Sequence, residues 1–209
     1  MTRAINFLKR KHFETHLPKD ILRVILDLKD RDVCIDVGAN VGMVSEIFLS
    51  RGAEVYAFEP HPDAFLKILE LKKKYKKFTP LNESAGISEE KVKLYLHTSH
   101  HFDSLKFSTG SSLMDSKPNV GSKFIVSNAI NFAEFLSRFP KIRILKIDIE
   151  GFEVQLIPHL INSRSLNNVD YVFVETHEKK WPDLKKMTDD MKQVVSESSY
   201  NDKIRWDWP

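Results

Sequence analysis

Short apolar segments alternate with longer amphipathic segments along most of this chain. Apolar runs of about four to eight residues between turn residues are typical of buried strands, whereas apolar positions at helical spacing indicate helices. The pattern predicts strands at 32–37, 54–58, 78–82, 91–97, 123–127, 142–149 and 169–175. It predicts helices at 2–12, 18–29, 43–51, 62–76, 131–138, 153–162 and 183–197.

The order of these elements indicates an α/β fold. Strands that alternate with helices form a mostly parallel, doubly wound sheet with helices on both faces. The first two helices form an N-terminal extension, which we expect to cover a ligand mouth together with the aperiodic segment 98–121. The chain closes with 204–208, which the pattern offers as an edge strand.

Length and composition fit one domain in a reducing compartment. We divide the 209 residues into N-terminal helices (1–30), a ligand-binding core (31–180) and a C-terminal helix with an edge strand (181–209). The net charge of +3 is too small to demand a nucleic-acid partner. The single cysteine, Cys34, falls in a predicted buried strand. No signal peptide or membrane-spanning segment is visible, so we expect a cytoplasmic protein without a membrane partner.

The segment from Val33 to Pro60 reads as strand, glycine turn, helix, strand and acid. This order is typical of a nucleotide-type ligand site on a doubly wound sheet. Gly38 and Gly42 allow the backbone to turn tightly and to approach a ligand closely. Glu59, at the end of the second strand, can accept hydrogen bonds from both hydroxyls of a ribose.

Two residues favour S-adenosylmethionine over a dinucleotide as that ligand. Asn40 stands where the dinucleotide fingerprint has its second glycine. Asp36 would repel a pyrophosphate, but it suits the ammonium and sulfonium groups of S-adenosylmethionine. The alternatives are a nicotinamide-dependent oxidoreductase, a nucleic-acid methyltransferase and a non-catalytic module that binds S-adenosylmethionine.

A second group of charged residues lies at the ends of the fourth and fifth strands of the alternating core. Lys146, Asp148 and Glu150 occupy alternate positions, so they would share one face at the carboxyl end of a strand. Glu175 and His177 have the same relation on the next strand. Open α/β sheets bind ligands at this edge. The candidates for a general base are therefore Asp148, Glu150 and His177.

Metal binding is a variant of this interpretation. Asp148 and Glu175 offer the oxygen ligands that Mg²⁺ prefers, and the ion would orient and acidify a hydroxyl. Glu153 is expected mainly to cap the helix that follows. Three neighbouring histidines lack the ligand spacing of a zinc site, and none is expected there. They are His97, His100 and His101.

Three blocks of the sequence, taken together, resemble the FkbM family of methyltransferases. They are Ile35–Gly42, Phe58–Pro60 and Leu145–Glu153, with Ser111 and Ser112 between the last two. The resemblance covers about residues 30–180. It implies the class I, Rossmann-like methyltransferase fold and O-methylation of a sugar, glycan or natural product.

The resemblance also assigns roles to residues. Asp36 to Gly42 would cradle the methionine part of S-adenosylmethionine, Glu59 with Pro60 would hold the ribose, and Asn82 to Ala85 would flank the adenine. The chain departs from the family at Ala129 to Asn131, where a Thr-Leu-Asp segment is common. Any role for that acid is therefore in doubt. Class I folds usually finish with a sixth strand and an antiparallel seventh, and only 204–208 is an obvious candidate here. The resemblance thus implies a sheet edge that is either incomplete or completed by a partner chain.

The long segment 98–121 is the expected substrate mouth. Ser111 and Ser112 are candidates to bind the acceptor by hydrogen bonds. Three aromatic side chains of this segment could stack on a sugar: His101, Phe102 and Phe107. The acceptor, the methylated position and the formation of a homo-oligomer stay open.

Overall fold

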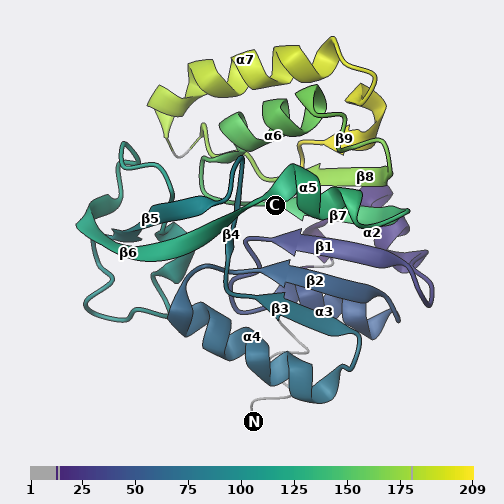
Figure 1. Ribbon diagram of the computed structural model, residues 1–209, viewed down its shortest axis with the longest axis horizontal. Coiled ribbons are helices and arrows are strands. Elements are labelled where there is room, and N and C mark those ends of the chain that lie inside the picture. Colours follow the sequence, from purple (N-terminus) through teal and green to yellow (C-terminus); the bar gives the residue numbers. More distant parts are fainter. Residues whose placement is uncertain (1–12, 14, 180) are drawn as a thin grey trace.

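A six-stranded parallel sheet forms the centre of the molecule (Figure 1). The computed structural model describes residues 13, 15–179 and 181–209, so the helix predicted at 2–12 lies outside the described residues. The strands are β1 (Val33–Val37), β2 (Glu54–Phe58), β3 (Phe78–Leu81), β7 (Ile142–Ile147), β8 (Val169–Val174) and β9 (Ile204–Arg205). Their order is β3-β2-β1-β7-β8-β9. The order reverses between β1 and β7, and ligands bind at such a switch point in open α/β sheets.

Helices cover both faces of this sheet, as predicted. One face carries α2 (Lys19–Leu26), α3 (Met43–Ser50) and α4 (Pro62–Lys74). The other face carries α5 (Phe132–Ser137), α6 (Glu153–Asn162) and α7 (Lys185–Ser196). Successive side chains of a strand point to opposite faces, so Cys34 packs with the first set of helices and Ile35 with the second. Both side chains are fully buried, which confirms that Cys34 is a core residue.

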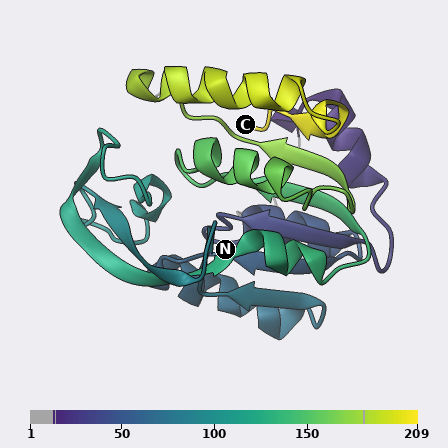
Figure 2. The ribbon, with the colours of Figure 1, turned by 45° about the horizontal axis from the view of Figure 1, so that its top comes forward.

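After β3 the chain builds a second sheet that the sequence pattern did not predict as a unit. Its strands are β4 (Ser84–Gly86), β5 (Glu90–His97) and β6 (Val120–Asn131), in the order β4-β6-β5. β5 and β6 lie beyond one end of the larger sheet in both views (Figure 1, Figure 2). The prediction of 123–127 for β6 was too short because much of this strand is exposed and few of its side chains are buried. Its pairing with β5 supplies order that hydrophobic alternation does not reveal.

The second N-terminal helix, α2, does not cover a ligand mouth, so the expectation was wrong for this helix. It lies at the amino-terminal edge of the large sheet, where Asp27 pairs with Arg143 near the start of β7 at 3.4 Å. Its apolar stripe is used by the core, since Ile21 and Ile25 are fully buried in the cluster that covers one sheet face.

The far edge of the large sheet is formed by β9, which is parallel to β8. The predicted strand at 204–208 is confirmed for its first two residues, whereas the ring of Trp208 stacks on Phe173 at 5.5 Å. Within the described residues no antiparallel strand follows, and completion of the edge by a partner chain stays a prediction. In the same part of the chain, none of the helices combines the length and the apolar character that crossing a membrane requires.

Candidate functional site

A cavity of about 310 Å³ opens at the carboxyl ends of β1, β2 and β7. It lies at the switch point of the large sheet and is closed on one side by the smaller sheet and the segment that follows β5. Most of the predicted site residues line it. They are Gly38, Asn40, Glu59, Pro60, Ala85, Ser111, Ser112, Asp148, Glu150 and Glu175. The residues that do not line it are Asp36, Gly42, Asn82 and His177.

Glu59 presents a fixed carboxylate on the wall of this cavity. Its Oε2 accepts a hydrogen bond from the backbone N–H of Asn40 at 2.7 Å, and its Oε1 accepts one from that of His61 at 2.8 Å. Asn82 holds the backbone behind it, since Nδ2 donates to the carbonyl of Glu59 at 2.8 Å. Burial raises the pKa of Glu59 to about 7, although the two backbone donors oppose this shift. Each carboxylate oxygen keeps a lone pair for a ligand hydroxyl.

The two glycines of the first turn are required for the tight turn, as predicted, and also for packing within the protein. Both adopt the left-handed backbone that the tight turn needs, with φ of +77° at Gly38 and +81° at Gly42. A Cβ on Gly38 would lie 1.8 Å from the carbonyl oxygen of Asp148. A Cβ on Gly42 would lie 2.7 Å from Leu71 of α4. The missing side chains therefore make room for other parts of the protein, and a role of these glycines in close approach to a ligand stays a prediction.

Asp36 faces a cation of the protein itself. Lys146, on β7, is buried, and its Nζ lies 3.2 Å from Asp36 Oδ1 and 3.3 Å from Asp148 Oδ2. Ser45 donates to the other oxygen of Asp36 at 2.6 Å. Burial opposes the charge of Lys146, but the two carboxylates hold its pKa above the usual value. The expectation that Asp36 turns its charge toward a cationic ligand is thus not met, because Ser45 and Lys146 occupy both oxygens.

Asp148 and Glu150 follow β7 rather than lie on it, because the strand ends at Ile147. The predicted strand was two residues too long, and the alternation that put Lys146 and these two acids on one strand face does not extend past its end. Glu150 has a left-handed backbone with φ of +57°. Its carboxylate pairs with Lys117 at 2.5 Å, and its carbonyl accepts a hydrogen bond from Ser112 at 2.8 Å.

His177 lies among four carboxylates, and its side chain is only 2% exposed. Its Nε2 is 3.4 Å from Glu150 and 3.6 Å from Asp148. Glu175 is 3.8 Å from the same nitrogen. Its Nδ1 is 3.2 Å from Glu153. Burial opposes protonation, but Glu153, together with Glu150 and Asp148, raises the pKa of His177 to about 9. The imidazole is therefore protonated at neutral pH, and it becomes a base only when a cation or ligand offsets these charges.

Glu153 was predicted to act mainly as a cap, and the structure adds a second contact. Its carboxylate is buried and accepts hydrogen bonds from the backbone N–H groups of Ile149 at 2.8 Å and Gly151 at 2.7 Å. The same carboxylate fixes His177 through Nδ1. No local pattern in the sequence signals this contact, because His177 follows β8 and reaches Glu153, at the start of α6, only in the folded protein.

The segment between β5 and β6 supplies wall residues that the sequence did not single out. Ser108 and Thr109, in the short helix η1 (Ser108–Gly110), line the cavity. Asn40 Nδ2 donates to Ser108 Oγ at 2.8 Å, which joins this segment to the first turn. Ser111 is buried on the wall, and its Oγ has no hydrogen-bond partner among the described residues.

The three aromatic candidates for sugar stacking have different surroundings. Phe102 is 78% exposed, and its ring contacts that of His101 at 3.9 Å. Phe107 stacks on His97 at 4.9 Å. None of these side chains lines the cavity, and their predicted contact with a sugar stays a prediction.

Two further features bear on binding and packing. Asp148, Glu175 and His177 each offer one ligand atom, and these atoms lie within 4.8 Å of one another. The pair predicted to bind Mg²⁺ is therefore brought together, with a histidine added.

Asn131 stands where the family commonly has the acid of the Thr-Leu-Asp segment. It caps α5 by accepting a hydrogen bond from the N–H of Glu134 at 3.3 Å.

Comparison with known proteins places this arrangement in a family. The model of the methyltransferase FkbM domain matches residues 36–202. The chain belongs to the FkbM methyltransferase family. The hexuronic acid methyltransferase AglP of Haloferax volcanii is 30% identical to this FkbM chain in an alignment of 166 positions that covers 76% of this chain. The match covers 62% of AglP, so the chain spans about three fifths of the length of this relative.

Two solved structures are similar to this FkbM chain at low scores. The precorrin 8w decarboxylase of Methanobacterium thermoautotrophicum is 13% identical, with a TM-score of 0.31, over 84% of this chain and 57% of that one. A protein described as a sarcosine dimethylglycine methyltransferase of Galdieria sulphuraria is 8% identical, with a TM-score of 0.30, over 94% of this chain and 82% of that one. The fold described above rests on the strand order of the FkbM chain itself.

Proposed function

We propose that this FkbM protein transfers the methyl group of S-adenosylmethionine to a hydroxyl of a sugar. The observation that carries the proposal is the cavity at the switch point, with Glu59 on one wall and the carboxylates around His177 near the other. Membership of the family supports methyl transfer over nicotinamide chemistry. The name of the Haloferax relative, a hexuronic acid methyltransferase, supports a sugar acceptor.

The charge of the cavity wall fits a cationic ligand. Five acidic residues line it, and no lysine or arginine is among the described lining residues. The acids are Glu59, Glu83, Asp148, Glu150 and Glu175. This wall suits the ammonium and sulfonium of S-adenosylmethionine and would repel the pyrophosphate of a dinucleotide. An acid that attracts a cationic ligand and repels a pyrophosphate was first expected at Asp36, and we now assign this role to the acids that line the cavity.

The reaction requires alignment, exclusion of water and removal of one proton. The bond between carbon and sulfur breaks while a bond between that carbon and the acceptor oxygen forms, and the hydroxyl proton passes to a base. Asp148 is the best placed of the three candidates because it lines the cavity and its ion pair with Lys146, at 3.3 Å, is longer than the one that holds Glu150. Glu150 is bound by Lys117, and His177 is buried behind the wall.

In the metal-dependent variant of this proposal, Asp148 and Glu175 instead hold a Mg²⁺ ion, and Asp148 is then a ligand rather than the base. The ion would supply Lewis-acid stabilisation of the developing alkoxide. A cation here would also offset the carboxylates that raise the pKa of His177. Both acids line the cavity, and their ligand atoms already lie close to one another.

Ligand-induced thermal stabilisation tests the cofactor. S-adenosylmethionine or S-adenosylhomocysteine at about 100 times its dissociation constant should raise the melting temperature by roughly 5–10 °C. We expect Glu59→Ala to abolish the shift and Glu70→Ala, at an exposed position on α4, to retain it. A shift with NAD or NADP and none with the sulfur ligands would refute the proposal.

A transfer assay tests the acceptor, the base and the metal. Labelled S-adenosylmethionine should methylate uronic acid glycosides, and Asp148→Asn should reduce turnover by at least about 100-fold, the usual contribution of a positioned base. A chelator should stop turnover, and added Mg²⁺ should restore it. Undiminished turnover with the chelator would exclude the metal, and near-normal turnover of Asp148→Asn would exclude this base.

A further inference from the structure

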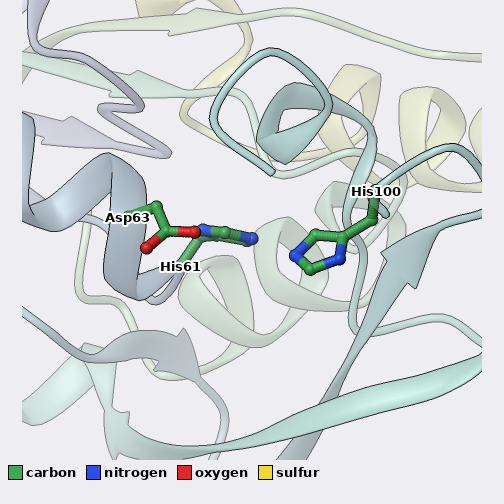
Figure 3. A group of neighbouring side chains, drawn as sticks. All are labelled: His61, Asp63 and His100. Atoms are coloured by element: carbon green, nitrogen blue, oxygen red, sulfur yellow. The ribbon is translucent and has the colours of Figure 1, made fainter. Parts of the chain in front are cut away.

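We propose that His61, Asp63 and His100 form a binding site for a divalent transition-metal ion of the Zn²⁺ class beside the cavity. Figure 3 shows the three side chains pointing toward one another. His61 and Asp63 come from the start of α4, and His100 comes from the segment that follows β5. Each offers one ligand atom, and these atoms lie within 4.8 Å of one another. The proposal does not depend on methyl transfer.

His61 gives the independent sign of a ligand. Its side chain is buried, with 1% of its surface exposed, and neither ring nitrogen has a hydrogen-bond partner among the described residues. Buried polar groups are nearly always paired, so an imidazole in this state calls for an explanation. The ring of His100 lies 5.5 Å away at an angle of 53°, so the two imidazoles meet without stacking face to face.

The other two ligands, Asp63 and His100, each form a hydrogen bond with a residue at the end of β5 or in the segment that follows it. Asp63 accepts a hydrogen bond from Ser104 Oγ through its Oδ2, the kind of support that orients a metal-binding carboxylate. The backbone N–H of His100 donates to the carbonyl of His97 at 2.9 Å. Ligand atoms of a tetrahedral zinc ion are about 3.4 Å apart, so the distances within the group must shorten by up to about 1.4 Å. Asp63 and His100 are half-buried, which leaves their side chains room to rotate.

The ligand types separate this site from the acids around His177. Two imidazoles and one carboxylate favour zinc and related transition metals, whereas the oxygen-rich pair Asp148 and Glu175 favours Mg²⁺. The sequence pattern concealed the site because His61 and His100 are far apart in the chain. His100 binds here without the neighbouring histidines, since His97 stacks on Phe107.

The position of the site suggests what the metal does. His61 lines the cavity, and its backbone N–H holds the carboxylate of Glu59. A metal shared with His100 would tie the segment that carries Ser108 to the start of α4 and so fix one wall of the cavity. Three protein ligands also leave a fourth coordination position for water or for another ligand.

Zinc binding by calorimetry, with Co²⁺ absorption as a second readout, tests the proposal on the purified full chain. We expect wild-type protein to bind Zn²⁺ and to show the visible bands of tetrahedral Co²⁺. His100→Ala and Asp63→Asn should each weaken binding by at least about tenfold. His101→Ala, at an exposed histidine one position along, should bind as the wild type does. Glu175→Gln, in the other group, should leave intact the binding that depends on His100.

Three outcomes would overturn the site. One is the absence of saturable Zn²⁺ binding in the wild type. Another is a loss of binding in Glu175→Gln with full binding in His100→Ala, which would place the ion among the other acids. The third is equal weakening by His101→Ala. Melting temperatures measured without metal show whether each variant is folded. If His100→Ala is not folded, the result with Asp63→Asn decides the proposal.

Discussion

Glu153→Gln removes one negative charge from the buried group around His177 while keeping the shape of the side chain. Glu153 Oε1 lies 3.2 Å from Nδ1 of the imidazole and is the first of the groups that raise the pKa of His177 from 6.5 to about 9. This difference corresponds to about 3 kcal/mol in favour of the charged form. Loss of one close opposite charge should lower the pKa of His177 by about 1–3.

The pH dependence of stability follows from the sign of this shift. A histidine whose pKa is raised on folding stabilises the protein fully below pH 6.5, and the contribution is lost as pH rises through about 9. The glutamine amide also turns an N–H group toward one of the two backbone donors, Ile149 or Gly151, which costs about 1–3 kcal/mol at any pH. We therefore expect a deficit of about 3–5 kcal/mol near pH 6 and a smaller one at pH 9.5.

Urea unfolding at these two pH values, together with an NMR titration of His177, measures both effects. Glu178→Gln is the matched control, because Glu178 follows His177 directly but pairs with Lys192 at 2.9 Å. It should leave the titration of His177 close to that of the wild type. The reasoning is refuted if Glu153→Gln leaves this titration unchanged, or if its stability deficit is the same at both pH values.

Two further substitutions test the packing beneath the site. Gly38→Ala should lower the free energy of unfolding by at least about 3 kcal/mol, because its Cβ would overlap the carbonyl oxygen of Asp148. Gly52→Ala, with a similar φ of +96° but no atom nearer than 3.7 Å, should cost less in the same urea titration; equal losses would contradict the steric argument. Lys146→Met should cost about 3–5 kcal/mol by leaving Asp36 buried without its cation. The double variant Lys146→Met, Asp36→Asn should regain part of this in a double-mutant cycle, whereas additive losses would show that the pair is not coupled.

The first half of the large sheet could be predicted from the sequence because its signals are local. The strand at 54–58 matches β2 residue for residue, since a buried run ends there at a turn. Glu59 follows directly, and its place at the carboxyl end of the strand puts it on the cavity wall. The position of an acid after a parallel strand is thus sufficient to locate this part of the site.

The remaining parts of the site depend on contacts between distant residues. The sequence shows that Asp36 is an acid before a turn, but it does not show that Lys146 on the neighbouring strand neutralises it. Lys117 lies in a polar segment without periodicity, so its ion pair with Glu150 has no local signal. The strand β6 was underestimated for a related reason, because backbone pairing rather than a buried face determines its length.

The raised pKa of Glu59 links the binding of a ligand in the cavity to the release of a proton from this side chain. Because burial raises the pKa of Glu59 to about 7, part of the Glu59 population is protonated in neutral solution before any ligand arrives. Hydroxyl groups that donate to the carboxylate favour its ionised form, so capture of a ribose would release protons to the buffer. Ligand affinity would therefore increase as the solution becomes more alkaline through neutrality, and the heat of binding would contain the protonation enthalpy of the buffer.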